Sequence, residues 1–169
     1  QHRGAHPADA QLFAPDQLPR LRAATSDLSW LMGRGYTIKA ALKLVGDGHS
    51  LTERQRLAVS RAACTDEQKE SRGARCLPVQ AVGHDELTVD GFNLIITVEA
   101  ALGGGALLLC RDETLRDLSS VHGSYRSVAE TDRAITLIGE ALEELRPGGA
   151  RWFLDRPVSN SGRLAQRIK

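Results

Sequence analysis

The chain has 169 residues, 41% of them hydrophobic and 25% charged, which is typical of a globular protein with one ordinary domain or two small ones. Lys and Arg number 22 against 21 Asp and Glu, and the net charge of +1 gives no indication of a polyanion partner, so any nucleic-acid contact must be local. Three cysteines without a CxxC pair argue against a disulfide framework or a zinc site. The polar start and the lack of a long apolar window argue against a signal peptide or a membrane span, so we expect a cytoplasmic protein.

The first part of the chain, residues 13–76, is predicted to form a small all-α domain. Apolar residues recur at helical spacing over Leu18–Leu31, and a second helix is expected over Thr37–Leu44. The pattern S-x-x-E at Ser50–Glu53 predicts a capping box that opens a third helix, and Thr65–Gln68 repeats the device. These short helices offer a surface for a homo-oligomer or for a protein partner.

A different pattern begins near residue 85, after a stretch rich in Arg, Gly and Pro that is typical of a linker. Three β-prone runs alternate with helices, of which one is expected over Asn93–Leu102 and the longest begins at a capping box, Ser127–Glu130. Strands that alternate with helices predict βαβ crossovers and a parallel sheet, so residues 85–169 are expected to form an α/β domain. The three runs are Leu87–Val89, Ala106–Cys110 and Arg151–Leu154.

An aspartate follows each predicted strand, namely Asp90, Asp112 and Asp155. Because ligands of parallel α/β sheets bind outside the carboxyl ends of the strands, adjacent strands would bring these carboxylates to one edge. Like charges in a partly dry site repel one another unless a cation neutralises them, and Mg²⁺ or Mn²⁺ suits carboxylates, water and a substrate phosphate. The aspartates therefore predict a metal site that hydrolyses phosphodiesters. Taken singly, each of them is also a candidate helix N-cap or turn former.

Two further polar residues accompany Asp90 in the stretch LTVDGFNLIITVEAALGGG. Asn93 is expected to cap the helix that it begins and also to orient a carboxylate or a metal-bound water. Glu99 lies one turn after Ile95 and Ile96, at the border of the apolar stripe. It is interpreted as an acid on the helix surface at the rim, and the alternative is a further acid that reaches the site.

Two polar segments are candidates for substrate contact. The loop Cys110–Arg126 gathers arginines, which bind phosphate as planar forks, and a histidine that can move protons near neutral pH. The segment before the basic C-terminal helix carries small hydroxyl residues, which can bind an anion at a helix N-terminus. Ordinary surface ion pairs and helix caps are the alternatives. The candidate substrate-binding residues are Arg116, His122, Tyr125, Arg126, Ser159 and Ser161, and Asp117 is a further acid of the loop.

The residues VDGFN, followed by a helix, resemble the signature of the NYN branch of the PIN-like nuclease superfamily. Four blocks together are similar to an uncharacterised prokaryotic family that joins a helical N-terminal domain of unknown function to a PIN-like domain. The resemblance covers most of the chain, from about Leu21 onward. The blocks are LVGDGHSLTERQR, VDGFNLIITVEAAL, RDLSSVHGSYR and LDRPVSNSG.

The resemblance implies a Rossmann-like, three-layer PIN-like domain with a parallel sheet, preceded by the small all-α domain, and an acidic cluster that binds Mg²⁺ or Mn²⁺ and acts on RNA. By position, Asp90 matches the first-strand metal ligand and Asp155 the later strand-end acid, while Asp112 and Asp117 are the candidates for the acid after the second strand. PIN-like domains have a further strand after the segment that matches SNSGRLAQRIK, whereas this chain ends at Lys169. We therefore expect a truncated domain, a partner that completes the sheet, or a site that binds without cleaving.

A metal-dependent nuclease that acts on RNA is the leading hypothesis. In this hypothesis the strand-end aspartates hold the metal, Asn93 and Ser159 orient ligands, and the basic loop residues contact the phosphate. The alternative is a catalytically incomplete PIN-like module that binds RNA or a nucleotide without cleavage.

Overall fold

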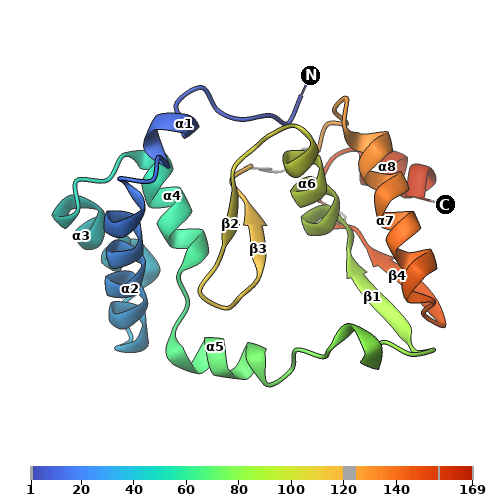
Figure 1. Ribbon diagram of the computed structural model, residues 1–169, viewed down its shortest axis with the longest axis horizontal. Coiled ribbons are helices and arrows are strands. Elements are labelled where there is room, and N and C mark those ends of the chain that lie inside the picture. The colour runs from blue at the N-terminus through green and yellow to red at the C-terminus, as the bar shows by residue number, and fades with distance from the viewer. Residues whose placement is uncertain (1, 120–124, 156, 169) are drawn as a thin grey trace. The chain divides into compact units, whose positions relative to one another are not determined.

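The computed structural model describes residues 2–119, 125–155 and 157–168, and the chain divides into two compact units (Figure 1). Both units are discontinuous in sequence. We call them the helical unit, which is His6–Cys76 with Ala106–Leu118, and the α/β unit, which is Gln1–Ala5, Leu77–Gly105 and Ser119–Lys169. The segment 106–118 therefore folds with the helices, although its position in the sequence placed it in the expected α/β domain.

The helical unit is built around α2, which packs against α3 and α4. Apolar residues at helical spacing on α2, Leu21, Ala24 and Leu28, share one buried cluster with Val45 of α3 and Val59 of α4. None of the helices formed by the described residues combines the length and the apolar character needed to cross a membrane. The helices of this unit are α1 (Asp9–Leu12), α2 (Leu18–Gly33), α3 (Ile38–Gly48), α4 (Glu53–Ala62) and α5 (Asp66–Gly73).

Side-chain capping boxes begin two of these helices. The box predicted at Thr65–Gln68 is confirmed at the start of α5. The box predicted at Ser50–Glu53 is wrong, because α4 is capped by Thr52–Gln55 instead. Ser50 has a φ of 50°, and the N–H of Leu51 bonds back to a carbonyl in the last turn of α3. Ser50 thus belongs to the end of α3 and cannot also cap the next helix.

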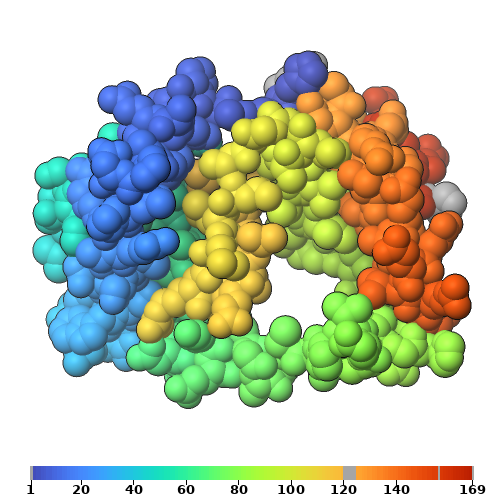
Figure 2. Space-filling model, viewed as in Figure 1, coloured from blue at the N-terminus to red at the C-terminus, as the bar shows by residue number. Residues whose placement is uncertain are grey.

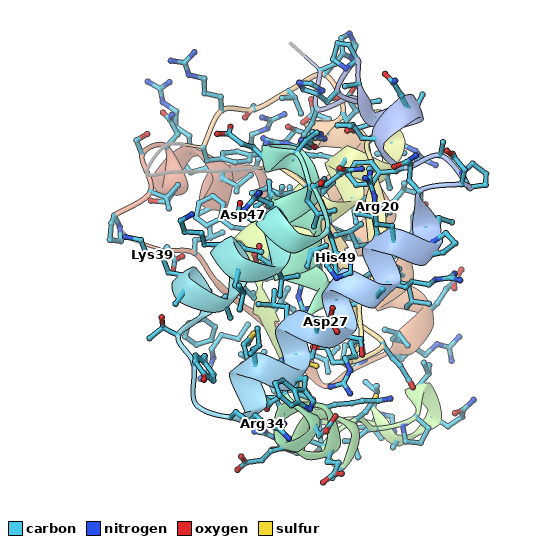
Figure 3. All side chains as sticks on the ribbon, turned by 90° about the vertical axis from the view of Figure 1, so that its left-hand side faces the viewer. Arg20, Asp27, Arg34, Lys39, Asp47 and His49 are labelled. Atoms are coloured by element: carbon cyan, nitrogen blue, oxygen red, sulfur yellow. The ribbon has the colours of Figure 1, made fainter. Side chains whose placement is uncertain are left out.

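Polar and aromatic side chains on α2 and α3 are paired within the helical unit (Figure 3). The His49 Nε2 atom lies 2.7 Å from Asp27 Oδ2, which joins the end of α3 to the middle of α2. The Arg34 guanidinium lies 3.5 Å from the centroid of the Trp30 ring, a cation–π contact at the end of α2. These contacts account for several of the charges on this face as packing within the unit.

The run 106–110 forms part of a hairpin, so the prediction of a parallel strand here is wrong. β2 (Leu107–Leu109) pairs antiparallel with β3 (Leu115–Asp117). The residues between them make a tight turn, in which the Cys110 N–H donates to the Thr114 carbonyl and Glu113 takes a φ of 64°. An apolar run by itself does not indicate whether its partner is the next segment or a distant strand.

The α/β unit contains a parallel pair of strands, as predicted. β1 and β4 are in register from Glu86 opposite Gly149 to Asp90 opposite Phe153. The helices of this unit bury a second cluster that includes Phe92, Ile95, Ile138 and Leu164. The protein is therefore mixed α/β, with a small two-stranded parallel sheet in the described residues. The elements of this unit are η1 (Val79–Ala81), β1 (Glu86–Asp90), α6 (Gly91–Leu102), α7 (Thr131–Leu145), β4 (Gly149–Phe153) and α8 (Ser161–Ile168).

The long helix α7 begins at Thr131, without the side-chain cap predicted at Ser127–Glu130. Its N-cap residue, Glu130, has helical backbone angles and makes no side-chain cap bond. The Thr131 hydroxyl instead accepts from the Val128 N–H and donates to the buried Glu99. A hydrogen bond to another helix, together with the local bond from Val128, thus positions the start of α7.

Candidate functional site

The carboxyl end of the parallel sheet carries two of the predicted acids, Asp90 and Asp155. Asp90 is the last residue of β1 and the N-cap of α6, because its Oδ1 accepts the Asn93 N–H at 3.2 Å. The Asn93 side-chain amide donates to Asp90 Oδ2 at 2.6 Å. The prediction that Asn93 caps the helix is therefore wrong: Asp90 is the cap, and Asn93 holds its carboxylate. Both aspartates and Asn93 are exposed to solvent.

Close packing at Gly91 brings the end of β4 to Asp90. A Cβ atom at Gly91 would lie 2.6 Å from Leu154 Cδ2 and 3.2 Å from the Phe153 carbonyl oxygen, so a larger residue would have to move the Leu154 side chain and press on the end of β4. Phe153 is the register partner of Asp90, and Asp155 follows two residues later. Two extended residues span at most about 7 Å and neighbouring strands lie about 4.8 Å apart, so the two aspartate Cα atoms lie within about 12 Å of each other.

Two exposed carboxylates at one sheet edge can share a divalent cation. Mg²⁺ is commonly held by one or two carboxylates, with water and a substrate phosphate in its other positions. Asp90, whose carboxylate is oriented by Asn93, and Asp155 are the two residues that would hold such an ion. No group of three or more His, Cys, Asp or Glu side chains suited to a metal ion occurs among the described residues. The described part of this edge therefore carries two candidate carboxylates.

Asp112 lies in the hairpin turn, which belongs to the helical unit. Its side chain has no exposed area and accepts hydrogen bonds from Arg72, from Arg116 at 2.7 Å and from the Thr114 hydroxyl at 2.7 Å. Burial raises the pKa of Asp112, but these hydrogen bonds outweigh burial and hold that pKa well below its usual range. Two arginines already neutralise the Asp112 carboxylate, and the hairpin that carries it is not part of the parallel sheet. Of the three aspartates predicted at the sheet edge, Asp112 is therefore excluded.

Asp117 and Arg116, the other acid and a candidate phosphate ligand, also make contacts inside the helical unit. Asp117 is 6% exposed at the end of β3, and its carboxylate lies 3.6 Å from the Arg61 guanidinium of α4. The Arg116 guanidinium donates to the Arg61 carbonyl as well as to Asp112. Both predicted site residues therefore fasten the hairpin to the helices.

Glu99 and Tyr125 form a buried network in the α/β unit. Glu99 is 0% exposed and accepts hydrogen bonds from Arg3 Nε at 2.6 Å, from the Tyr125 hydroxyl at 2.5 Å and from the Thr131 hydroxyl at 2.5 Å. The prediction of a surface acid is wrong, because Glu99 is buried. A carboxylate at this depth is stable only when several donors bind it. Tyr125, predicted to contact substrate, is 1% exposed and donates inward. Burial, and then the Glu99 carboxylate, raise the pKa of Tyr125 to about 12, so its hydroxyl is protonated at neutral pH.

The N-terminal segment reaches Glu99 because its backbone packs on the end of α6. A Cβ atom at Gly103 would lie 2.7 Å from the Arg3 carbonyl oxygen, and one at Gly4 would lie 2.9 Å from the Gly103 carbonyl oxygen. His2 adds a contact of 2.6 Å with Glu130. The place of Glu99 beside the apolar stripe was a local signal of burial, whereas nothing in the sequence around Arg3 indicates its partner.

Three of the remaining substrate-binding candidates lie close to the start of α8. The Tyr125 N–H donates to the Ser159 carbonyl at 3.3 Å, which brings the chain segment that contains Arg126 beside the residues that precede α8. The Arg126 side chain is exposed, and Ser161 is the first residue of α8. His122 lies outside the described residues. Arg126, Ser159 and Ser161 are thus brought together, without Arg116.

The chain matches two family models in succession. Residues 20–75 match "Protein of unknown function (DUF434)", and residues 79–169 match "Domain of unknown function (DUF5616)". An uncharacterised protein of Methanocaldococcus jannaschii is 31% identical over 149 residues, which cover 88% of this chain and 71% of that protein. No solved structure matches the chain. Because the second family model covers more than half of the chain, the chain belongs to the DUF5616 family.

Proposed function

We propose that the α/β unit is a PIN-like, metal-dependent nuclease module with a Rossmann-like arrangement, and that it hydrolyses phosphodiester bonds in RNA. The parallel register of β1 and β4 is the observation that supports the proposal most directly. It sets Asp90, and the segment that leads to Asp155, at the carboxyl edge where parallel α/β sheets bind ligands. The resemblance of VDGFN to the NYN signature supports RNA as the substrate class.

Asp90 and Asp155 hold Mg²⁺ or Mn²⁺ in this proposal, and the residues around them orient the substrate. The bound ion supplies an activated water and neutralises charge on the phosphate. Asn93 keeps the Asp90 carboxylate in place through its side-chain amide, so it is a positioning residue. Arg126, Ser159 and Ser161 contribute donors to the phosphate oxygens near the N-terminus of α8.

A second candidate function is the binding of RNA or a nucleotide without cleavage. One observation favours it: the described residues bring two acids to the sheet edge and no group of three that could hold a metal. A single ion with few protein ligands depends more on the substrate phosphate for its binding. The same edge would then hold a phosphate, through a cation, without activating a nucleophile.

The test is cleavage of labelled single-stranded RNA and DNA of mixed sequence by the full chain in Mn²⁺, with Mn²⁺ binding followed by electron paramagnetic resonance. We expect Asp90→Asn to weaken Mn²⁺ binding and to lower the cleavage rate by about 100-fold or more. The reason is that a bound ion lowers the free energy of the charged transition state by several kcal/mol. Asp85→Asn is the matched control, since Asp85 is an exposed acid just before the opposite end of β1.

Three outcomes separate the candidates. Cleavage that depends on Asp90 and not on Asp85 supports the nuclease. Retention of RNA in Mg²⁺ and in Mn²⁺ without any cleavage supports the binding module, provided that Asp90→Asn weakens retention. Equal behaviour of the parent and Asp90→Asn in both assays would falsify both, because neither function could then reside at this edge.

A further inference from the structure

A cavity of about 560 Å³ lies wholly within the helical unit, between α2, α4 and β2. Its walls are mostly apolar and include Leu18 and Leu21 of α2 and Ala58 of α4. Figure 2 shows the hairpin residues, in gold, beside α2, in blue. Its volume lies in the range of about 300–1,000 Å³ that is usual for ligand clefts. It lies outside the sheet edge of the proposed nuclease site, and nothing in the proposed function uses it.

The cavity runs along the edge of β2. Residues 106–111 all line it, without a gap. A cavity against one face of a strand would touch alternate residues, because successive side chains point to opposite faces. No residue of β3 lines it. The cavity therefore follows the edge of β2 that faces away from β3.

That edge carries backbone N–H groups that have no hydrogen-bond partner among the described residues. The Cys110 N–H donates to the Thr114 carbonyl, so Cys110 and, two residues earlier, Leu108 direct their backbone groups toward β3. Leu107 and Leu109 alternate with them, so their N–H and C=O groups point into the cavity. Neither N–H makes a hydrogen bond with any described residue. At the far end the Arg111 N–H donates to the Ala62 carbonyl, which closes the groove against α4.

One cation lies at the rim of this groove. Arg22 of α2 lines the cavity and is exposed. Within the described part of the chain it makes no ion pair and no side-chain hydrogen bond, in contrast to Arg111, which is bound to Asp66 and to the Cys64 carbonyl. An anionic group of a bound molecule would be a natural partner for the Arg22 guanidinium.

We propose that this groove binds an extended peptide segment of another protein, which adds as a strand to the free edge of β2 and places an acidic side chain against Arg22. An unpaired strand edge is satisfied most completely by another backbone, and peptide recognition by strand addition takes its affinity from those main-chain bonds. The apolar walls select apolar side chains at alternate positions of the peptide. This site does not depend on the proposed nuclease activity.

The first experiment selects peptides from a random nine-residue display library with the full chain, and counter-selects with the variant Ser26→Trp. Ser26 is an exposed residue of α2 that lines the groove, so tryptophan there fills the site from the rim. Ala23→Trp is the matched control, because Ala23 is exposed on the same helix and does not line the groove. We expect enriched peptides with alternating apolar residues and one acid, which bind the parent and Ala23→Trp alike and bind Ser26→Trp at least tenfold more weakly.

Two changes test whether the peptide pairs with the backbone of β2. Methylation of alternate amide nitrogens of the selected peptide removes its donors, and Leu109→Pro removes one donor from the outer edge of β2, a position at which proline is tolerated in edge strands. Each change should weaken binding at least tenfold. Because Leu109→Pro can also disturb the hairpin, amide hydrogen exchange of the parent is the second measurement: the amides of Leu107 and Leu109 should become protected when peptide is added.

Charge reversal tests the contact with Arg22. Arg22→Glu should weaken binding of the acidic peptide. The same variant should bind a peptide in which lysine replaces the acid more tightly than the parent binds that peptide. The proposal is overturned if no peptide survives counter-selection, or if amide methylation leaves binding unchanged. Concentration-dependent dimers that Leu109→Pro abolishes would assign the edge to a second copy of this chain. Displacement of the peptide by decanoate at equal affinity would assign the cavity to an apolar carboxylate, and either result overturns the peptide as its occupant.

Discussion

Removal of the Arg3 guanidinium should destabilise the α/β unit strongly, although Arg3 lies in the N-terminal segment. Arg3 donates through Nε to Glu99 at 2.6 Å, and its side chain is 14% exposed. In Arg3→Ala the Glu99 carboxylate stays buried and loses its cationic partner. Loss of one member of a buried ion pair costs about 3–5 kcal/mol, and the contact of Arg3 with the Tyr125 ring, at 5.6 Å, adds about 0.5 kcal/mol. We expect a loss of about 3.5–5.5 kcal/mol.

Urea unfolding followed by tryptophan fluorescence measures this loss. Trp152 packs against the core of the α/β unit, and Trp30 of the helical unit is 55% exposed. A background of Trp30→Phe therefore leaves a single reporter on the unit of interest. With a urea dependence of about 1–3 kcal/mol per molar, the expected loss lowers the midpoint by about 1–5 M. His2→Ala is the control, because the His2 side chain is 74% exposed, and its midpoint should stay close to that of the parent.

A double variant separates the buried charge from general damage to the N-terminal segment. Arg3→Ala with Glu99→Gln removes the cation and the carboxylate charge together, so it should be more stable than Arg3→Ala alone. If Arg3→Ala unfolds at the urea concentration of the parent, or if Glu99→Gln gives no recovery, the pair is not the support that its geometry implies.

Three further changes follow from the buried contacts. Burial and then the Glu99 carboxylate raise the pKa of Tyr125 to about 12. The contribution of this hydroxyl to the free energy of unfolding is therefore complete below pH 10 and falls by about 3 kcal/mol between pH 10 and 12. Tyr125→Phe should remove that fall in urea titrations at each pH. Burial raises the pKa of Asp112 but its hydrogen bonds lower it further, so its stabilisation of the helical unit is present at neutral pH and declines below about pH 4, and Asp112→Asn should flatten the acid limb of the unfolding curve. Gly91→Ala should cost about 1–3 kcal/mol by its clash with the end of β4, whereas Gly162→Ala, which meets open space, should be neutral or slightly stabilising in thermal unfolding.

Local patterns predicted the features whose partners are near in the chain. The capping box at Thr65–Gln68 formed as expected because both of its members lie within one helical turn. The alternation of strands with helices also predicted a parallel sheet, which the pair β1 and β4 confirms, although it did not indicate which strands are neighbours. Asp90 was placed at the strand end by the same reasoning.

The strand that pairs with the apolar run at 106–110 was not predicted correctly. This run fits a central strand and a hairpin strand equally well, since its composition records burial and not a partner. The five-residue turn decided between them: Asp112 accepts from Thr114, and Glu113 adopts a left-handed conformation. This choice removed Asp112 and Asp117 from the expected metal site, and it left the edge of β2 open beside α4.

Helix periodicity, the capping box of α5 and the end of β1 were predicted from the amino-acid order, because each depends on residues within a few positions of one another. The partner that neutralises the buried Glu99 was not predicted, because that cation, Arg3, lies 96 positions away in the chain. Only the packing of Gly4 on Gly103 brings that cation to the end of α6, and a contact between two backbones leaves no periodic pattern in a sequence. Local chemistry therefore determined where the acids stand along the chain, and tertiary packing decided that β1 pairs with β4 while Glu99 became part of the core.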